Sequence, residues 1–253
     1  MHTPKPMMAA IARHHSKQDR HAHRLAEKTF RASQTSLINK LEAFPRFATK
    51  RSVARFLARY EIYKELLHVN GSIVECGVFN GAGFFSWAQF ANIFEPSNHS
   101  RKIIGFDTFE GFPSLSGEDE DERKTFTAGD MRGDTADQLR ASIGKYDAER
   151  HLSHIPNAEI VQGDFMETAE SYVAAHPHLL VALLYLDFDL FEPTRKALEL
   201  FLPRMPKGAI VCFDELNCEA FPGETAALLE MLPIRHCELR RFPFDPWISY
   251  MKL

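Results

Sequence analysis

The chain has 253 residues, of which 45% are hydrophobic and 25% are charged, with a formal net charge of −4. This length and composition fit one large α/β domain with an added segment. No N-terminal stretch has the apolar core of a signal peptide, and no apolar run is long enough to cross a bilayer. We therefore expect a cytoplasmic protein without a membrane span.

The charge is unevenly distributed. Residues 1–60 contain 13 Lys and Arg against 3 Asp and Glu, so the rest of the chain is strongly acidic. Aromatic residues do not alternate with this basic charge, and we expect no nucleic-acid partner. The four cysteines form no CxxC pair, which favours reduced, structural thiols over a zinc site.

The N-terminal part precedes the main pattern of strands and helices. Residues 1–33 contain several histidines among Lys and Arg and show no sustained apolar period, so we expect a basic, flexible tail. Apolar residues at helical spacing predict helices over 34–44 and 51–69. We assign residues 34–70 to a helical extension and 71–253 to the main domain.

The main domain alternates strand-like and helix-like segments. Predicted strands cover 72–78, 102–107, 159–161, 179–186 and 209–213, with helices over 82–93, 135–149, 167–175, 192–202 and 224–232. This alternation predicts a doubly wound, Rossmann-like α/β fold, mostly parallel, with helices on both faces. Two short strands over 237–239 and 247–251 predict an antiparallel edge hairpin. The acidic run at 118–122 is interpreted as solvated surface.

The first predicted strand ends in GSIVECGVFNGAG, which places Glu75, Gly77, Gly81 and Gly83 across a strand, a turn and a helix start. Glycines at such a turn let a ligand approach the backbone. The spacing is not the GxGxxG of dinucleotide binding, and a carboxylate before the glycines can pair with an ammonium group. S-adenosylmethionine has such a group. The alternative is a turn that serves packing alone.

Two further strand ends carry acids. Asp107 ends the second strand, where an acid can accept both hydroxyls of a ribose, or can instead cap the following turn. The motif QGDF ends the third strand, so Asp164 could meet an adenine amine and Phe165 could cover the ring. All three strand ends fit one ligand.

The segments LLYLDFDLFEPT and VCFDELN end the fourth and fifth predicted strands. Neighbouring parallel strands lie about 4.8 Å apart, so their acids converge and would repel without a cation. Oxygen ligands favour Mg²⁺ or a similar divalent ion. We predict Asp187, Asp214 and Glu215 as ligands and Asp189 as the proton acceptor for an alcohol whose pKa the cation lowers. The alternative places Asp189 near a helix N-cap.

Together these motifs resemble the macrocin O-methyltransferase family of class I, S-adenosylmethionine-dependent enzymes. The segments that carry the resemblance lie between residue 72 and about residue 230 and read VECGVFNGAG, IIGFDTFEGFP, VQGDFMET, LYLDFDLFEPTRKALELFLPRMPKGAIVCFDE and FPGETAALLE. The resemblance implies methylation of a sugar hydroxyl with Mg²⁺. It makes Asp187 the first metal aspartate, Asp189 the general base, and Asp214 with Glu215 the metal-binding pair. We expect Phe79, Phe109 and Gly163 to complete the cofactor site.

The chain departs from the family pattern at three positions. Glu215 stands where the family usually has Asp, Phe191 replaces a common Tyr, and Asn80 occupies a frequent Arg position. We also expect the loop at 109–113 to close over the site.

Two other functions fit part of the pattern. The DFD motif alone fits a metal-dependent nucleotide-sugar glycosyltransferase, but this leaves Glu75 and the second acid pair unexplained. A noncatalytic methyltransferase-like scaffold has no use for mutually repelling acids. For an enzyme we expect a small hydroxylated acceptor, in first place a sugar. We also expect a homo-oligomer in which the helices over 34–69 pack on the site or between subunits.

Overall fold

The computed structural model describes residues 17–119 and 126–253. The chain divides into two units, Met1–Leu57 and Ala58–Leu253, and the boundary lies within one long helix. All predicted site residues belong to the second unit, so this unit alone positions the site.

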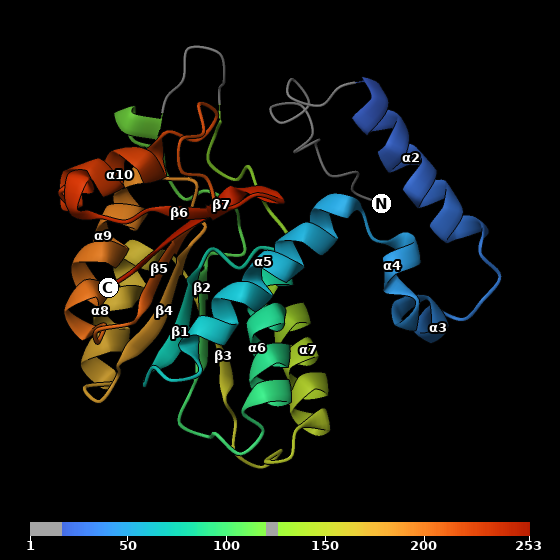
Figure 1. The fold of residues 1–253 in the computed structure, drawn as a ribbon, viewed down its shortest axis with the longest axis horizontal. Coiled ribbons are helices and arrows are strands. Elements are labelled where there is room, and N and C mark those ends of the chain that lie inside the picture. Colours follow the sequence, from blue (N-terminus) through green and yellow to red (C-terminus); the bar gives the residue numbers. More distant parts are fainter. Residues whose placement is uncertain (1–16, 120–125) are drawn as a thin grey trace. The chain divides into compact units, whose positions relative to one another are not determined.

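A seven-stranded sheet forms the centre of the second unit (Figure 1). Its strands are β1 (Ser72–Cys76), β2 (Ile103–Asp107), β3 (Ala158–Gln162), β4 (Val181–Leu186), β5 (Ile210–Phe213), β6 (Arg240–Phe242) and β7 (Asp245–Lys252). The strand order is β3-β2-β1-β4-β5-β7-β6. Strands β1 to β5 are parallel, and β7 is antiparallel to β5 and β6. The predicted mostly parallel sheet with an antiparallel edge hairpin is confirmed.

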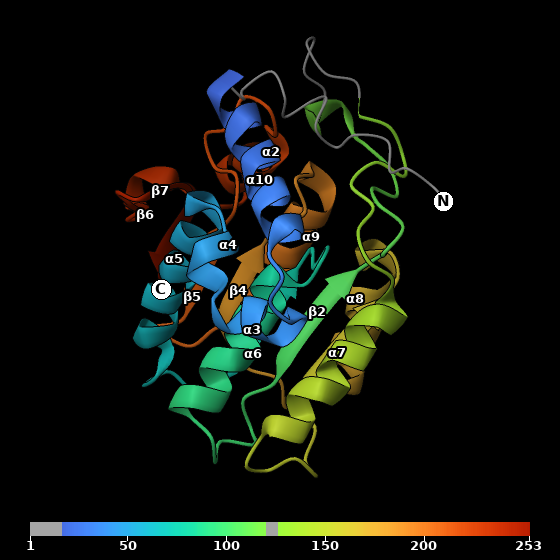
Figure 2. The same cartoon turned by 90° about the vertical axis from the view of Figure 1, so that its right-hand side faces the viewer.

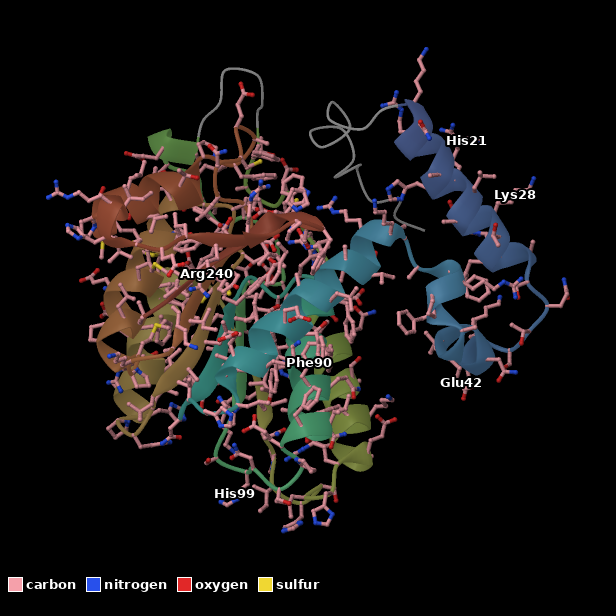
Figure 3. The ribbon with its side chains drawn as sticks, viewed as in Figure 1. His21, Lys28, Glu42, Phe90, His99 and Arg240 are labelled. Carbon is pink, nitrogen blue, oxygen red and sulfur yellow. The ribbon has the colours of Figure 1, made fainter. Side chains whose placement is uncertain are left out.

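Helices cover both faces of this sheet (Figures 1 and 2). One face packs against the C-terminal part of α5 (Lys50–Leu66), α6 (Ala82–Phe94) and α7 (Ala136–Glu149). Figure 3 marks Phe90 on α6, whose ring lies 5.6 Å from that of Tyr63 on α5. The other face packs against α8 (Phe165–Ala175), α9 (Phe191–Phe201) and α10 (Gly223–Met231). Two hydrophobic cores result, one on each side.

The strand sequences explain their places in the sheet. All residues of β1 and β4 are buried, as expected for continuous apolar strands with neighbours on both sides and helices on both faces. Only one residue of β3, Ala158, is buried, because this strand forms the sheet edge. Thr135 and Gln138 form a capping box that starts α7.

The strand order reverses at β1, which pairs with β2 on one side and β4 on the other. Such a switch point places a crevice at the carboxyl ends of the strands. Gly77 directly follows β1 and packs against the backbone at the end of β4. A Cβ atom on it would lie 1.9 Å from the carbonyl oxygen of Asp187. Only glycine therefore fits between the two strand ends.

The N-terminal unit differs from the expectation. Residues 1–16 lie outside the described residues, but Lys17–Ala32 forms helix α2, where we expected a flexible tail. This segment has no Pro or Gly and consists mainly of good helix formers. Its few apolar residues, Ala22, Leu25, Ala26 and Phe30, recur at helical spacing, which the sequence prediction overlooked. The helix predicted over 34–44 is divided into α3 (Leu37–Glu42) and α4 (Phe44–Phe47). Ser36 caps α3, and Pro45 lies in the first turn of α4.

Two other predictions need correction. Strand β6 begins at Arg240, not over 237–239, because β6 pairs with β7 as far as Phe242 and only a tight turn separates them. The acidic run is not uniformly solvated: Asp119 is buried. Its carboxylate accepts hydrogen bonds from Ser116 and from the backbone N–H of Phe191 at the start of α9.

Candidate cofactor and metal site

The turn after β1 is built around the carboxylate of Glu75. A Cβ atom on Gly83 would lie 2.4 Å from Oε1 of Glu75, so this glycine lets the carboxylate reach the first turn of α6. Gly81 has a left-handed backbone, with φ of 80°, and is the N-cap of α6. The acid before the glycines and the last glycine of the motif are thus direct neighbours.

Glu75 is only 1% exposed and has partners within the protein. The indole Nε1 of Trp87 donates to Oε2 of Glu75 at 2.6 Å, and the backbone N–H of Phe84 also bonds to this carboxylate. Burial raises the pKa of Glu75 to about 8, and the nearby Arg59 guanidinium opposes this rise. Its predicted contact with an ammonium group stays a prediction.

Asp107 connects two loops at the carboxyl edge. Its Oδ2 accepts the backbone N–H groups of Val78 and Phe79, at 2.7 and 2.8 Å, and its Oδ1 accepts that of Phe109 at 2.6 Å. An ionised carboxylate has about four acceptor positions, so Asp107 keeps limited capacity for a ribose. These hydrogen bonds are those expected if Asp107 caps the turn. Capping of the turn does not exclude a contact with a ribose, which stays a prediction.

The end of β3 has a similar local role. Gly163 has a φ of 134°, and its N–H donates to the backbone carbonyl of Asp107 at 3.0 Å. Asp164 is the N-cap of α8, where its side chain accepts the N–H of Met166. Phe165 is 3% exposed and lies in the core, with its ring 4.9 Å from that of Phe188. The predicted adenine contacts of Asp164 and Phe165 stay predictions, and the burial of Phe165 does not favour its role as a ring cover.

Backbone strain is concentrated at this edge. Among the described residues, five non-glycine residues have a positive φ, and four of them follow the carboxyl ends of parallel strands: Phe79, Phe109, Asp189 and Asn217. Such conformations cost about 1–3 kcal/mol each and often occur at ligand sites. The edge is therefore a site candidate on geometric grounds as well.

The predicted acids do converge beyond β4 and β5. Asp187, Asp214 and Glu215 each offer a ligand atom, and these atoms lie within 4.8 Å of one another. Asp214 and Glu215 are almost fully buried. Asp189 is also buried and shares a hydrogen bond with Glu215. Burial and the charges of Glu215 and Asp187 raise the pKa of Asp189 well above its ordinary value.

Sequence reasoning missed a fifth acid, Glu224. It lies in the first turn of α10 and is 0% exposed. Its Oε2 accepts the backbone N–H of Glu215 at 3.2 Å, and its Oε1 has no hydrogen-bond partner among the described residues. Burial, and then the charge of Glu215, raises its pKa well above the ordinary value. The segment FPGETAALLE, which contains Glu224, is one of those that carry the family resemblance, but its sequence does not predict that this acid lies beside Glu215.

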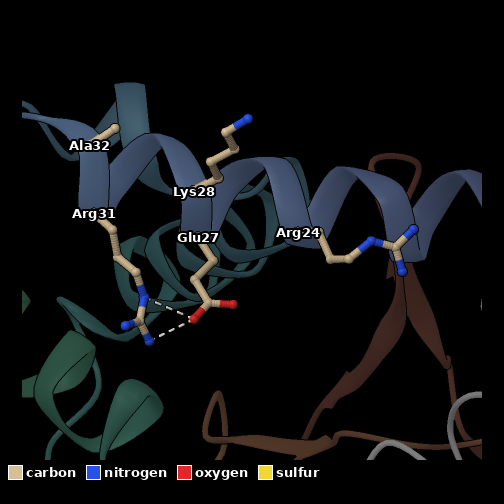
Figure 4. A pocket seen from close by; sticks show the side chains of 5 residues that line it. All are labelled: Arg24, Glu27, Lys28, Arg31 and Ala32. Carbon is tan, nitrogen blue, oxygen red and sulfur yellow. Dashed lines mark hydrogen bonds and ion pairs between the residues drawn. The ribbon is translucent and has the colours of Figure 1, made fainter.

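The N-terminal unit has a separate pocket along α2, lined by Arg24, Glu27, Lys28, Arg31 and Ala32 (Figure 4). Arg31 bends toward Glu27 and forms an ion pair of 2.7 Å, while Arg24 points away from this pair. None of the predicted site residues lines this pocket.

Comparison with known proteins identifies the family. The model of the macrocin-O-methyltransferase (TylF) family matches residues 7–227, which is most of the chain. The chain belongs to the macrocin O-methyltransferase family. The resemblance stated from the sequence motifs is therefore confirmed, and the match reaches further toward the N-terminus than those motifs.

Several proteins are similar to this family member. The crystal structure of CalS11, a calicheamicin methyltransferase, superposes with a TM-score of 0.89 at 30% identity, covering 100% of this chain and 98% of that one. The apo structure of CalS11, described as a TDP-rhamnose 3'-O-methyltransferase, gives a TM-score of 0.81 at 29% identity, with 94% and 95% coverage. These likenesses confirm the class I methyltransferase fold.

A curated relative from Streptomyces olivaceus is 8-demethyl-8-(2,3-dimethoxy-alpha-L-rhamnosyl)-tetracenomycin-C 4'-O-methyltransferase. It is 27% identical over 156 residues, which cover 60% of this chain. The match spans about half of the relative, 55% of its length. In the described part of this chain, no helix is both long and apolar enough to cross a membrane.

Proposed function

We propose that the protein transfers a methyl group from S-adenosylmethionine to a hydroxyl of a sugar, with a divalent cation such as Mg²⁺ at the acid cluster. The observation that carries this proposal is the convergence of Asp187, Asp214 and Glu215, within 4.8 Å, beyond strands that neighbour the glycine turn. Family membership supports methyl transfer over the glycosyltransferase and scaffold alternatives.

The residues present fit S-adenosylmethionine. When bound, this cofactor supplies an activated methyl group on a sulfonium. Gly77, Phe79 and Gly81 form the turn that it would approach, and Asp107 fixes this turn against Phe109. A turn held by backbone hydrogen bonds is preorganised, so less free energy of binding is spent on ordering it.

The acid cluster fits a hard cation. Closely spaced carboxylates repel one another unless a positive charge joins them, and their oxygens are the ligands that Mg²⁺ prefers. Glu215 replaces the usual Asp, yet its ligand atom still lies within the group. A bound cation supplies positive charge that lowers the pKa of a nearby acceptor hydroxyl.

Asp189 is the residue that we propose as general base. Its carboxyl group lies beside Glu215 rather than within the ligand group, so it can take the proton of the acceptor hydroxyl as the oxygen attacks the methyl carbon. The sulfonium loses its charge in this step. Holding both reactants in line supplies much of the acceleration.

The acceptor class follows from the relatives. The name of CalS11 specifies TDP-rhamnose, and the name of the Streptomyces olivaceus enzyme specifies a rhamnosyl group on tetracenomycin C. We propose a sugar hydroxyl as the acceptor here, either on a nucleotide sugar or on a glycosylated natural product.

Titration calorimetry tests the binding of the cofactor, and a methyl-transfer assay tests the need for the metal. We expect saturable binding of S-adenosylmethionine by the purified protein, and methyl transfer to TDP-rhamnose or a rhamnosyl glycoside only with Mg²⁺ present. Asp214→Ala should keep cofactor binding and lose the Mg²⁺ response. Binding of a nucleotide sugar without any binding of S-adenosylmethionine would refute the methyltransferase assignment.

A further inference from the structure

A buried tyrosine connects the acid cluster to helix α5. Tyr185 lies on β4, is 0% exposed, and donates its hydroxyl proton to Oδ1 of Asp214. The same hydroxyl accepts a hydrogen bond from Nη2 of Arg59 at 3.4 Å. The Arg59 guanidinium also lies over the Tyr185 ring, 5.4 Å from its centroid. Three side chains thus form one line from α5 to the end of β5.

The direction of these hydrogen bonds follows from the chemistry of the groups. A guanidinium has only donors, so the tyrosine oxygen must accept from Arg59. Tyrosine has a single hydroxyl proton, and this proton is then directed to Asp214. A carboxylate that accepts such a bond is held in one orientation and favoured in its ionised form. Asp214 also offers one oxygen to the group of three ligand atoms that lie within 4.8 Å of one another.

The groups around Arg59 stabilise its buried positive charge. Arg59 is 6% exposed; burial lowers its pKa, but interactions with Tyr185, Glu75 and Asp187 outweigh this effect, so its pKa is raised. Glu75 and Tyr185 are paired across β1 and β4, so their side chains emerge on the same face of the sheet. The ring of Trp87, which donates to Glu75, lies 5.6 Å from that of Tyr185. The Arg59 guanidinium therefore interacts with Glu75 and Asp187, and reaches Asp214 through the Tyr185 hydroxyl.

We propose that Arg59 and Tyr185 are positioning residues for the metal site: they orient Asp214 so that one of its oxygens can bind the cation. This inference rests on the proposed metal dependence of the methyl transfer. The sequence motifs did not single out either residue, because Arg59 lies on a helix before the segments that carry the family resemblance and Tyr185 lies within the apolar run of β4.

The test compares three variants with wild type in Mn²⁺ binding, followed by electron paramagnetic resonance, and in S-adenosylmethionine binding, followed by calorimetry. Tyr185→Phe removes the donor to Asp214 and should weaken Mn²⁺ binding by about 10–100-fold, since outer partners of metal ligands usually contribute that much. Arg59→Met should also weaken Mn²⁺ binding. Arg59→Lys keeps a donor-only cation and should restore part of the affinity.

Tyr63→Phe is the matched control. Tyr63 is also 0% exposed and also donates to a carboxylate, Oε2 of Glu95 at 2.5 Å, but it lies outside the acid cluster. This variant should lower the melting temperature and leave Mn²⁺ affinity unchanged. Tyr185→Phe should change Mn²⁺ affinity more than S-adenosylmethionine affinity.

The outcomes separate two failures. If wild type binds S-adenosylmethionine but not Mn²⁺, the proposed metal dependence is wrong, and the positioning role is wrong with it. If wild type binds Mn²⁺ and Tyr185→Phe binds it equally well, the positioning role alone is wrong and the proposed function stands. A loss of Mn²⁺ binding in Tyr63→Phe as large as in Tyr185→Phe would also overturn the inference, because general loosening would explain both.

Discussion

Asp187 and Asp189 are two residues apart, yet they have different surroundings. Asp187 belongs to the group whose ligand atoms lie within 4.8 Å, whereas Asp189 has a left-handed backbone, with φ of 63°, and bonds to Glu215. The positive φ turns Asp189 away from the strand direction, so the two carboxylates can have separate roles at one strand end.

We predict that Asp189→Asn binds S-adenosylmethionine and Mg²⁺ like wild type but turns over about 10²–10⁴-fold more slowly. The amide keeps the size of the side chain and cannot accept the proton, and general base catalysis typically contributes this factor. Calorimetry measures the two affinities, and a methyl-transfer assay measures the rate.

Asp137→Asn is a suitable control for this rate, because the Asp137 side chain is 91% exposed on α7. It should match wild type in all three measurements. Full turnover by Asp189→Asn would remove Asp189 as the base.

The buried Glu75 predicts a pH dependence of stability. Its pKa is raised from 4.5 to about 8 in the folded protein. Between these values the folded state holds a proton that the unfolded chain has released, so stability falls as the pH rises from about 4.5 to about 8. The largest effect is about 5 kcal/mol. Glu75→Gln, which keeps an acceptor for Trp87, should flatten this slope in urea unfolding of the protein without cofactor.

Glu110→Gln removes an exposed acid and should keep the slope of wild type. An unchanged slope in Glu75→Gln would mean that Glu75 is ionised in the folded protein across this range.

At the scale of residues, the sequence predicted the acids that converge because their positions follow from strand ends. It predicted Asp187, Asp214 and Glu215 for that reason, since parallel strands bring their carboxyl ends to one edge. Glu224 could not be found in this way. It reaches Glu215 from the first turn of a helix, and the direction in which a helix returns to a sheet depends on tertiary packing.

At the scale of elements, Arg101 holds the end of α5 on the sheet. Its guanidinium donates to the backbone carbonyls of Leu66, Val69 and Gly71 and forms an ion pair of 2.7 Å with Glu95. The Arg101 side chain is only 4% exposed. One buried cation thus satisfies the carbonyl groups where α5 ends and the chain enters β1.

We predict that Arg101→Met lowers the free energy of unfolding by about 3–5 kcal/mol, because it leaves three backbone carbonyls without their donor and removes the cation that pairs with the partly buried Glu95 carboxylate. Urea unfolding measures this loss. Arg140→Met is the matched control: it removes an exposed ion pair of 2.9 Å, in which the Arg140 side chain is 47% and the Asp137 side chain 91% exposed, and such pairs contribute about 0–1 kcal/mol. Equal losses in the two variants would contradict the role of Arg101.

The order and type of the elements in the main domain followed from the sequence, and the departures have local causes. The apolar run of β4 and the capped start of α7 are strong signals. Helix α2 has few apolar residues in a strongly basic segment, so their helical spacing is a short signal, and helix propensity adds to it. The position of β6 depends on its pairing with β7, which no local pattern specifies.

At the scale of the whole molecule, the boundary between the units lies within α5. Ala58, Ile62, Tyr63 and Leu66 are all 0% exposed and belong to the core on one face of the sheet. The α3 side chains of Leu37, Ile38 and Leu41, by contrast, are 64–70% exposed. The C-terminal part of α5 is therefore integral to the main domain. The exposed apolar side chains of α3 are in line with the homo-oligomer expected from the sequence, which stays a prediction.

We predict that a protein starting at Lys50 keeps the fold of the main domain and loses the oligomer, whereas one starting at Asn70 does not fold. The second truncation removes core residues that the first one keeps. Light scattering gives the masses, and thermal unfolding reports the fold.

The comparison needs the full chain as its reference. An oligomer of unchanged size in the protein starting at Lys50 would exclude α3 and α4 from the interface, and a cooperative transition in the one starting at Asn70 would show that α5 is dispensable.

Strand β7 lies inside the sheet, between β5 and β6, although it is formed by residues 245–252. During synthesis on the ribosome, β5 is therefore complete about thirty residues before its neighbour exists. For that interval β5 has an open edge of unpaired backbone groups, and such edges pair readily with other chains. Nascent chains that stall before β7 should depend on chaperones to avoid aggregation.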